Sequence, residues 1–394
     1  VRHRLPVIPY RQNLLMLMAL AALLSGCRND RNLSKESVIA HLPTKPTTLH
    51  PTNGNGAYRE LIFQYTQMRL QRTDLRNGEL LHPLLTKPPE PGPDSLRYTY
   101  QLKKGITWDD STPLTVKDVL FTLKMNVCPL TDNPSRQSSY DPINRVEIRP
   151  EADRTFTLVF DRQHFANSRI FENGLYLMQR SKEDPEGVMT QFSVEKLQNP
   201  DFEPDDHPRL QAFMKRFNAG SRGNDPGRFN GLGPYKVTEW QNTNIITLER
   251  KPDWWGQDSD LVYHQQAPDK IVFKVIRDNF AAGLALRNSS LDVSAHISLN
   301  ELSKSRHRAY FRKQYRSGFV KRYGYTYIGL NMRPGLKRDP YFAQQKVRKA
   351  IAHLVPVQEL IKVIANGRAQ RLASFVSPLK PSYNEQLPLI RENI

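Results

Sequence analysis

Apolar residues recur along this chain at two spacings, and each spacing predicts a different kind of element. Residues 98–102 (YTYQL) place Tyr, Tyr and Leu at alternate positions, which is the period of a half-buried β-strand. Comparable distributions of apolar residues predict further strands at 156–160, 235–240, 244–250, 270–276 and 325–331.

Helical spacing is clearest in residues 116–123 (VKDVLFTL), which carry apolar side chains at positions i, i+3, i+4 and i+7. Thr115 precedes this segment and Asp118 follows three residues later, so the pair approximates a capping box with Asp in place of Glu. Further helices are predicted at 61–70, 280–286, 346–354 and from Pro356 to just before Gly367. Strands and helices mix without strict alternation, which indicates an α/β or α+β class.

Three segments lack either spacing. Residues 44–57 are dense in Pro, Gly, Thr and Asn and predict a loop, and 88–93 (PPEPGP) predict a turn-rich connector. Residues 185–225 are charged and contain several prolines, so we interpret them as an irregular surface insertion.

The first residues resemble a bacterial lipoprotein signal. Three arginines precede an 11-residue apolar stretch, Leu14–Leu24, which is too short to span a bilayer. Leu24-Ser25-Gly26-Cys27 then resembles the lipoprotein box, in which the cysteine becomes the lipidated first residue of the mature chain. We therefore predict a signal peptide at 1–26, lipidation of Cys27 and a tether at 27–40. An ordinary secretory signal with an incidental cysteine is the alternative.

The composition narrows the class of protein to which the chain can belong. The 394 residues suffice for two or three domains, and the net charge of +18 falls to +15 without residues 1–26. Apolar runs after residue 24 are too short for a polytopic membrane protein. If Cys27 is lipidated, only Cys128 remains, so no intramolecular disulfide is expected.

Several sequence blocks, in this order, resemble the peptide/nickel-binding extracytoplasmic solute-binding proteins (family 5) of ABC transporters. They are 98–124 (YTYQLKKGITWDDSTPLTVKDVLFTLK), 231–237 (GLGPYKV), 248–256 (LERKPDWWG), 284–293, 328–331 and 347–352. Two departures stand out: Asp109-Asp110 replaces the family's Asp-Gly, and 355–357 (VPV) replaces an Asp-Arg helix start. Without Gly, Asp110 must tolerate a left-handed turn or change it.

The resemblance implies an α/β, two-lobed architecture of the periplasmic-binding-protein type II class with an extra subdomain. It assigns 41–70 and 186–295 to the first lobe, 71–185 to the extra subdomain and 296–394 to part of the second lobe. Family members continue well beyond the position of Pro378, so the second lobe is expected to be incomplete. The implied function is binding of a peptide between the lobes, hinge closure and delivery to a permease, outside the cytoplasm and at a membrane.

Candidate ligand contacts follow from position in this scheme: Thr52 and Asn53 in the loop after Pro51, and Tyr325 and Asn331 near the later strand. No catalytic residue, metal site or cofactor is predicted, and the chain lacks a nucleophile–base motif that would support a secreted hydrolase. Alternatives are a nickel, haem or other small-solute receptor, or a remnant that binds nothing. The acidic cluster at 203–207 is better interpreted as a polar loop than as a metal site.

Residues 304–322 are basic and aromatic, with eight Lys and Arg, four Tyr and Phe, and no acid. Such a composition is typical of nucleic-acid binding. However, Phe311, Tyr315 and Phe319 recur every four residues with arginines beside them, which predicts a solvated amphipathic helix face. Export argues against a nucleic-acid partner, so anionic lipid headgroups are the better functional alternative. The four tryptophans are interpreted as core residues rather than as the lining of a ligand pocket.

Overall fold

The computed structural model describes residues 37–389 except 55, 75, 134–138, 149–152, 173, 226–227, 229–230, 241–243, 266–267, 321–323, 334–340 and 381–382. The predicted signal peptide, Cys27 and most of the predicted tether lie outside these residues. The chain divides into two units, Val1–Ser37 and Val38–Ile394. The elements described below belong to the second unit, except for Ser37 at the start of β1.

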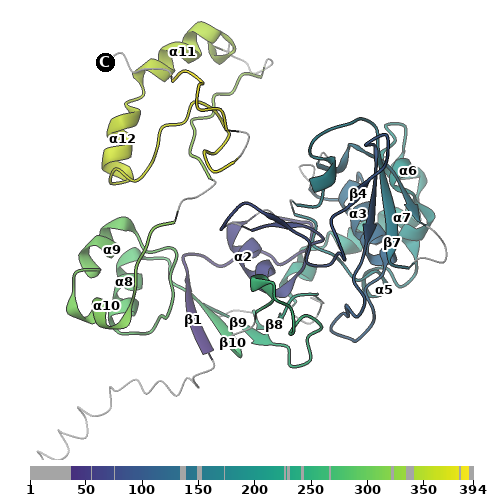
Figure 1. Ribbon diagram of the computed structural model, residues 1–394, viewed down its shortest axis with the longest axis horizontal. Helices are drawn as coiled ribbons and strands as arrows, with labels where there is room; N and C mark the ends of the chain where they lie inside the picture. The colour runs from purple at the N-terminus through teal and green to yellow at the C-terminus, as the bar shows by residue number, and fades with distance from the viewer. Residues whose placement is uncertain are drawn as a thin grey trace, which may run out of the picture. The chain divides into compact units, whose positions relative to one another are not determined.

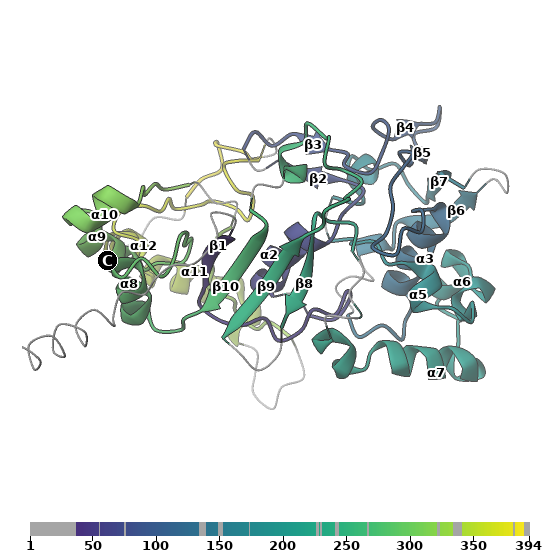
Figure 2. The same ribbon diagram turned by 90° about the horizontal axis from the view of Figure 1, so that it is seen from below.

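One four-stranded sheet combines the first strand of the described chain with three from its middle. Its members are β1 (Ser37–Leu42), β10 (Lys270–Val275), β9 (Ile245–Arg250) and β8 (Tyr235–Glu239), in that order, and Figure 2 shows β10, β9 and β8 side by side. The three predicted middle strands are confirmed to within a residue at each end, whereas β1 occupies the last four residues of the predicted tether. Helix α2 (Ala57–Thr66) packs Ile62 and Phe63 into the core beneath this sheet.

A second four-stranded sheet is antiparallel and has the order β4-β5-β7-β6. Its strands are β4 (Glu90–Pro91), β5 (Arg97–Gln101), β7 (Thr155–Phe160) and β6 (Ile143–Ile148). Tyr100 faces Phe156 across the β5–β7 pair, and their rings stack with centroids 5.0 Å apart. The alternating pattern at 98–102 thus describes a strand whose inward side chains fill a core. A separate pair, β2 (Arg72–Thr73) and β3 (Leu80–Leu81), lies before it in the chain.

Helix α3 (Val116–Val127) begins as its sequence predicts. Thr115 is the N-cap, and the Asp118 carboxylate accepts hydrogen bonds from the Thr115 backbone N–H (2.9 Å) and hydroxyl (3.2 Å). The departure from Asp-Gly just upstream is accommodated differently from our expectation, because the positive φ (65°) falls on Ser111 and not on Asp110.

The interpretation of 185–225 as a surface insertion is wrong. The segment forms α6 (Val194–Gln198) and α7 (Pro208–Phe217), just after the short α5 (Arg180–Glu183). Its apolar side chains share one core with β5, β7 and α3: Val188, Met189, Phe192, Val194, Leu197, Leu210, Phe213, Met214 and Phe217. Charged residues occupy the outward side of α7. They make the segment polar on average, although one side of the helix is apolar. The predicted domain boundary at 185/186 therefore divides segments that share a core.

Three short helices form a small group of their own (Figure 1): α8 (Asn279–Arg287), α9 (Leu299–Ser305) and α10 (Ala309–Gln314). They enclose Ala285, Leu286, Leu291 and Phe311. The prediction of one helix face through Phe311, Tyr315 and Phe319 is wrong because α10 ends at Gln314. Tyr315 leaves the helix, and its hydroxyl lies 2.9 Å and 2.8 Å from the carbonyls of Leu286 and Leu291, between which it shares its proton.

The last helices are α11 (Gln345–Leu354) and α12 (Val357–Ile364), as predicted, and neither has a buried residue. Asn366 takes a positive φ (48°) after α12, and the Gly367 N–H donates to the Ile361 carbonyl (3.0 Å), which ends the helix. The predicted strand at 325–331 does not form, because no strand in the described chain pairs with it. Short 3-10 turns lie at Asn167–Arg169, Val188–Gln191, Pro204–Asp206, Gly220–Asn224, Val262–His264 and Tyr341–Ala343. Among the described helices, none is long and apolar enough to cross a bilayer.

Candidate ligand-binding site

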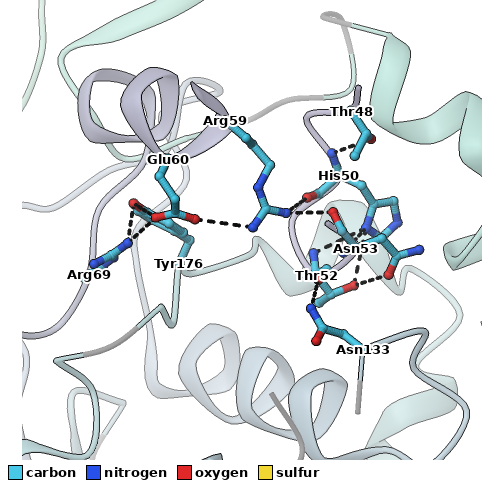
Figure 3. Close-up of polar contacts among 9 residues, drawn as sticks. All are labelled: Thr48, His50, Thr52, Asn53, Arg59, Glu60, Arg69, Asn133 and Tyr176. Atoms are coloured by element: carbon cyan, nitrogen blue, oxygen red, sulfur yellow. Dashed lines mark hydrogen bonds and ion pairs between the residues drawn. The ribbon is translucent and has the colours of Figure 1, made fainter. Parts of the chain in front are cut away.

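The loop between β1 and α2 is organised around the imidazole of His50 (Figure 3). His50 Nε2 lies 2.6 Å from the Phe217 carbonyl, which can only accept, so Nε2 carries the proton. Nδ1 is then the acceptor for the backbone N–H groups of Thr52 (3.3 Å) and Asn53 (3.1 Å). Burial lowers the pKa of His50 to about 4, despite the opposing hydrogen bond to Phe217. The loop is therefore held by a neutral histidine.

Arg59 of α2 holds the same loop from the other side. Its Nη1 donates to the carbonyls of His50 (2.8 Å) and Asn53 (2.7 Å), and the side chain is buried. Its Nη2 lies 3.3 Å from Glu60 Oε1, and Glu60 in turn accepts from the Tyr176 hydroxyl (2.9 Å) and pairs with Arg69. A buried guanidinium needs such partners, because an unpaired buried charge costs several kcal/mol, roughly 3–5 on removal of one partner.

Two further segments also hold this loop in place. Asn133 Nδ2 donates to the Thr52 carbonyl (2.6 Å), and the Leu49 N–H donates to the Gly223 carbonyl (2.7 Å). A Cβ on Gly223 would lie 1.7 Å from Thr48 Oγ1, so this close approach requires glycine. The loop is thus fixed by residues that are distant in sequence. No pattern of residue types marks His50, Arg59, Asn133 or Gly223 as its supports.

The four predicted ligand contacts fall into two pairs. Thr52 is fully buried, and its hydroxyl lies 3.3 Å from His50 Nδ1 and donates to Asn53 Oδ1 (3.0 Å), so its side chain supports the loop. Asn53 is half-buried, with Nδ2 3.5 Å from the Asn218 carbonyl. Tyr325 and Asn331 are exposed in the irregular segment where a strand was expected. Within the described chain, no hydrogen bond or ring contact joins one pair to the other.

A cavity of about 390 Å³ lies beside this loop. Phe217, whose carbonyl accepts from His50, and Arg222 line it. Its charged lining has both signs: Arg222 pairs with Glu183 and lies over the Phe217 ring (4.4 Å to the centroid), and Arg216 lies 3.7 Å from Glu186. Burial lowers the pKa of Arg222 to about 10, with Arg228 a further cause. Sequence reasoning missed this cavity because most of its lining comes from 185–225, which prolines and charges predict to be an irregular insertion. The i, i+3, i+4, i+7 spacing of Leu210, Phe213, Met214 and Phe217 was the available signal.

Three of the sequence blocks quoted above meet at one junction. Lys251 pairs with Asp109 and donates to the Gly231 carbonyl (2.7 Å), and the indole N–H groups of Trp254 (2.8 Å) and Trp255 (3.0 Å) donate to the Leu232 carbonyl. Burial lowers the pKa of Lys251, opposed by Asp109. The blocks therefore serve to join the second sheet to the first.

The remaining candidates have structural roles. Trp108, Trp240 and Trp254 are buried, which confirms the interpretation of these three as core residues. In the acidic cluster at 203–207, Asp205 accepts from Gln211 (2.7 Å), and His207 stacks on Phe202. No group of three His, Cys, Asp or Glu side chains in the described residues has the geometry of a metal site.

Comparison with known proteins places the chain in a family. The sequence profile described as "Bacterial extracellular solute-binding proteins, family 5 Middle" matches residues 81–390. The probable peptide-binding protein YejA of Agrobacterium fabrum is 26% identical over 293 residues, covering 72% of this chain and 41% of its own. The oligopeptide-binding protein AppA of Bacillus subtilis is 22% identical over 302 residues, covering 74% and 45%. The chain therefore spans less than half the length of these relatives.

Solved structures show the same fold. AppA from Bacillus subtilis in complex with a nonapeptide superposes with a TM-score of 0.66 at 18% identity, over 91% of this chain and 61% of that one. DppA from Helicobacter pylori in complex with the peptide STSA gives a TM-score of 0.64 at 17% identity, over 90% and 63%. The mixed α/β fold is that of the two-lobed periplasmic binding proteins, and the chain belongs to the bacterial extracellular solute-binding proteins of family 5.

Proposed function

We propose that this protein binds peptides outside the cytoplasm and delivers them to the permease of an ABC importer. The observation that carries the proposal is the superposition of 91% of the chain on AppA, whose structure holds a nonapeptide. Peptide-binding relatives by sequence support the same ligand class. The function is one of binding, with no catalytic residue and no cofactor.

Within this function we assign separate roles to the predicted site residues. Thr52 supports the loop that presents Asn53, whose amide is half-exposed and can contact a peptide backbone. Tyr325 and Asn331 are exposed and would contact the ligand from the later segment. We propose 41–70 with 231–295 as the first lobe, and 71–217 as the extra subdomain, because 188–217 share its core. Residues 296–394 contribute to the second lobe, with α9 and α10 packed on α8 of the first lobe at the boundary between the two.

The ligand class is tested by native mass spectrometry of protein purified from cells, followed by calorimetry with mixed di- to pentapeptides. Co-purifying peptide and heat of binding are expected. Tyr325→Ala and Asn331→Ala should weaken peptide binding without changing stability, whereas Thr52→Ala should lower the free energy of unfolding. Absence of peptide binding together with binding of a nickel chelate would overturn the proposal. A structure of similar fold, NikZ of Campylobacter jejuni, is a complex with Ni(L-His).

We also propose that Cys27 is lipidated and holds the mature protein at a membrane. The small residues Ser25 and Gly26 after a short apolar core support this. Cys27→Ser should release the protein from the membrane fraction after a high-salt wash, which removes electrostatic binding. Retention of that variant would contradict lipid anchoring.

A further inference from the structure

The helices α8, α9 and α10, together with residues 315–319, carry an uneven charge; we call them the basic module. Residues 279–319 contain seven Lys and Arg against two Asp and Glu. Both carboxylates have partners: Glu301 pairs with Lys304, and Asp292 accepts from the Ile39 N–H (2.8 Å). The module therefore presents an excess of positive charge.

The cations of the basic module point away from its core. Arg308, Arg312, Lys313 and Arg316 are exposed, and their side chains make no ion pair or hydrogen bond with the described part of the chain. Unneutralised cations this close together repel one another, and this repulsion destabilises the folded module. An anionic partner would relieve that repulsion.

Three aromatic residues beside these cations, Tyr310, Phe311 and Tyr315, are turned inward, whereas Phe319 is exposed. Their placement bears on the kind of anion. Phe311 is buried, Tyr310 and Tyr315 pack against the module's core, and the Tyr315 hydroxyl is bonded to backbone carbonyls. Single-stranded nucleic acid is held by exposed aromatic rings on which bases stack. Most of these rings are already packed against the module's core and are not available for stacking. The module is therefore suited to bind a phosphate-rich surface through charge alone.

The module also contacts β1, a strand that lies close in sequence to the proposed anchor. Ile39 packs against the module's core, and the Ala40–Val293 bridge and the His41–Ser294 hydrogen bond (2.9 Å) join β1 to it. Ile39 follows Cys27 by 12 residues, which span at most about 40 Å when extended. A lipid on Cys27 would therefore keep the module within that distance of a bilayer.

We propose that the basic module docks on the surface of a bilayer containing anionic phospholipids, with Arg308, Arg312, Lys313 and Arg316 facing the headgroups. Each Lys or Arg near such a surface strengthens binding by about 1 kcal/mol, or about fivefold. Export of family 5 proteins makes a membrane, and not nucleic acid, the available polyanion. The proposal draws on the proposed anchor only for proximity and does not depend on peptide binding.

The test uses the full chain with Cys27→Ser, so that no lipid anchor contributes. Vesicles of phosphatidylcholine alone, or mixed with phosphatidylglycerol, are sedimented with this protein at low and high salt. We expect binding to the mixed vesicles, loss of binding at high salt, and none to phosphatidylcholine alone. Arg308→Gln/Arg312→Gln/Arg316→Gln should weaken binding by about 100-fold.

A matched control removes the same charge elsewhere. Lys104, Lys117 and Arg162 are exposed on the part of the chain that contains the second sheet, and Lys104→Gln/Lys117→Gln/Arg162→Gln should bind almost as the parent does. Equal weakening by both triple variants would mean that only net charge matters and would overturn the proposal. So would absence of binding to the mixed vesicles, or binding to duplex DNA but not to vesicles. If the Cys27→Ser variant stays in the membrane fraction after the high-salt wash, that result contradicts the lipid anchor and leaves the docking proposal unaffected.

Discussion

Helices α3 and α12 both carry apolar residues at helical spacing, yet they have opposite surroundings. Ten of the 12 residues of α3 are buried, including Asp118 and Lys124, whereas none of α12 is buried. In α12, Leu360 is 40% exposed and Ile364 is 72% exposed, although its apolar and polar sides are separated more sharply than those of α3. The comparison teaches that sequence periodicity predicts a helix, and that the packing partner decides how much free energy the helix contributes.

Polar residues of α3 show how complete its packing is. The Asp118 carboxylate also accepts from the Arg180 N–H (2.8 Å), and Lys124 Nζ donates to the Met189 carbonyl (2.9 Å). Burial lowers the pKa of Lys124 to about 8, with Asp184 opposing the shift. These groups are stable in the core because their hydrogen bonds are satisfied.

Hydrogen exchange should show the largest difference between the two helices. Opening of α3 requires loss of the main core, with a free energy near that of global unfolding, about 5–15 kcal/mol. Amides of α12 should exchange at least about 1,000-fold faster, because no burial protects them. Mass spectrometry of peptides covering 116–127 and 357–364 measures this. Similar protection in both would show that α12 is covered in solution.

The sequence predicted elements better than their surroundings. Helix α3, its Thr115 cap and strands β5, β7, β8, β9 and β10 followed from local spacing, because side-chain periodicity is a local property. The strand at 325–331 was wrong, since a strand requires a neighbour that its own residues do not specify. The insertion at 185–225 was wrong because prolines and charges outweighed the helical spacing of α7.

The candidate site was still less accessible to sequence reasoning. Position in the family resemblance pointed to the loop of Thr52 and Asn53, but not to the residues that hold it. His50, Arg59 and Asn133 meet there from separate segments, and their bonds run to backbone carbonyls or N–H groups. Such contacts depend on tertiary structure and leave no pattern of residue types in the sequence.

Matched leucine substitutions should sharpen the comparison. Leu123 of α3 is 1% exposed, so Leu123→Ala should lower the free energy of unfolding by about 2–5 kcal/mol through lost burial and a cavity. Leu360→Ala in α12 removes the same atoms from an exposed position and should change it by less than about 0.5 kcal/mol. Urea unfolding followed by tryptophan fluorescence measures both. Equal losses would mean that Leu360 is packed in solution.

Acid should destabilise the packed region through its buried histidines. Burial lowers the pKa of His264 to about 4, with Lys103 and Arg72 as lesser causes. Its ring packs edge-on against both Trp254 and Trp255, with centroids 5.1 Å and 5.4 Å away. The unfolded chain binds a proton near pH 6.5, so stability is full above 6.5 and is lost as pH falls towards 4, by up to about 3 kcal/mol.

The variant His264→Phe tests this loss. It keeps a ring packed against the two tryptophans and removes the titrating group, so its stability should fall less between pH 6.5 and 4 than that of the parent. His307→Phe, at an exposed position, is the control and should retain the parent's dependence. If His264→Phe leaves the pH dependence unchanged, His50 and the carboxylates account for the acid sensitivity instead.

The smallest expected effect concerns how the two helices begin. Thr115 caps α3 in a reciprocal box with Asp118, whereas Pro356 precedes α12 without a side-chain hydrogen bond. Thr115→Ala should therefore lower the free energy of unfolding by about 1 kcal/mol, and Thr115→Ser should retain most of it. Pro356→Ala should leave the global transition unchanged, because α12 contributes little to the core that this transition reports. Urea titration of the three variants at pH 7 measures these differences. A loss from Pro356→Ala as large as that from Thr115→Ala would show that α12 unfolds together with the core, and would remove the contrast between the two helices.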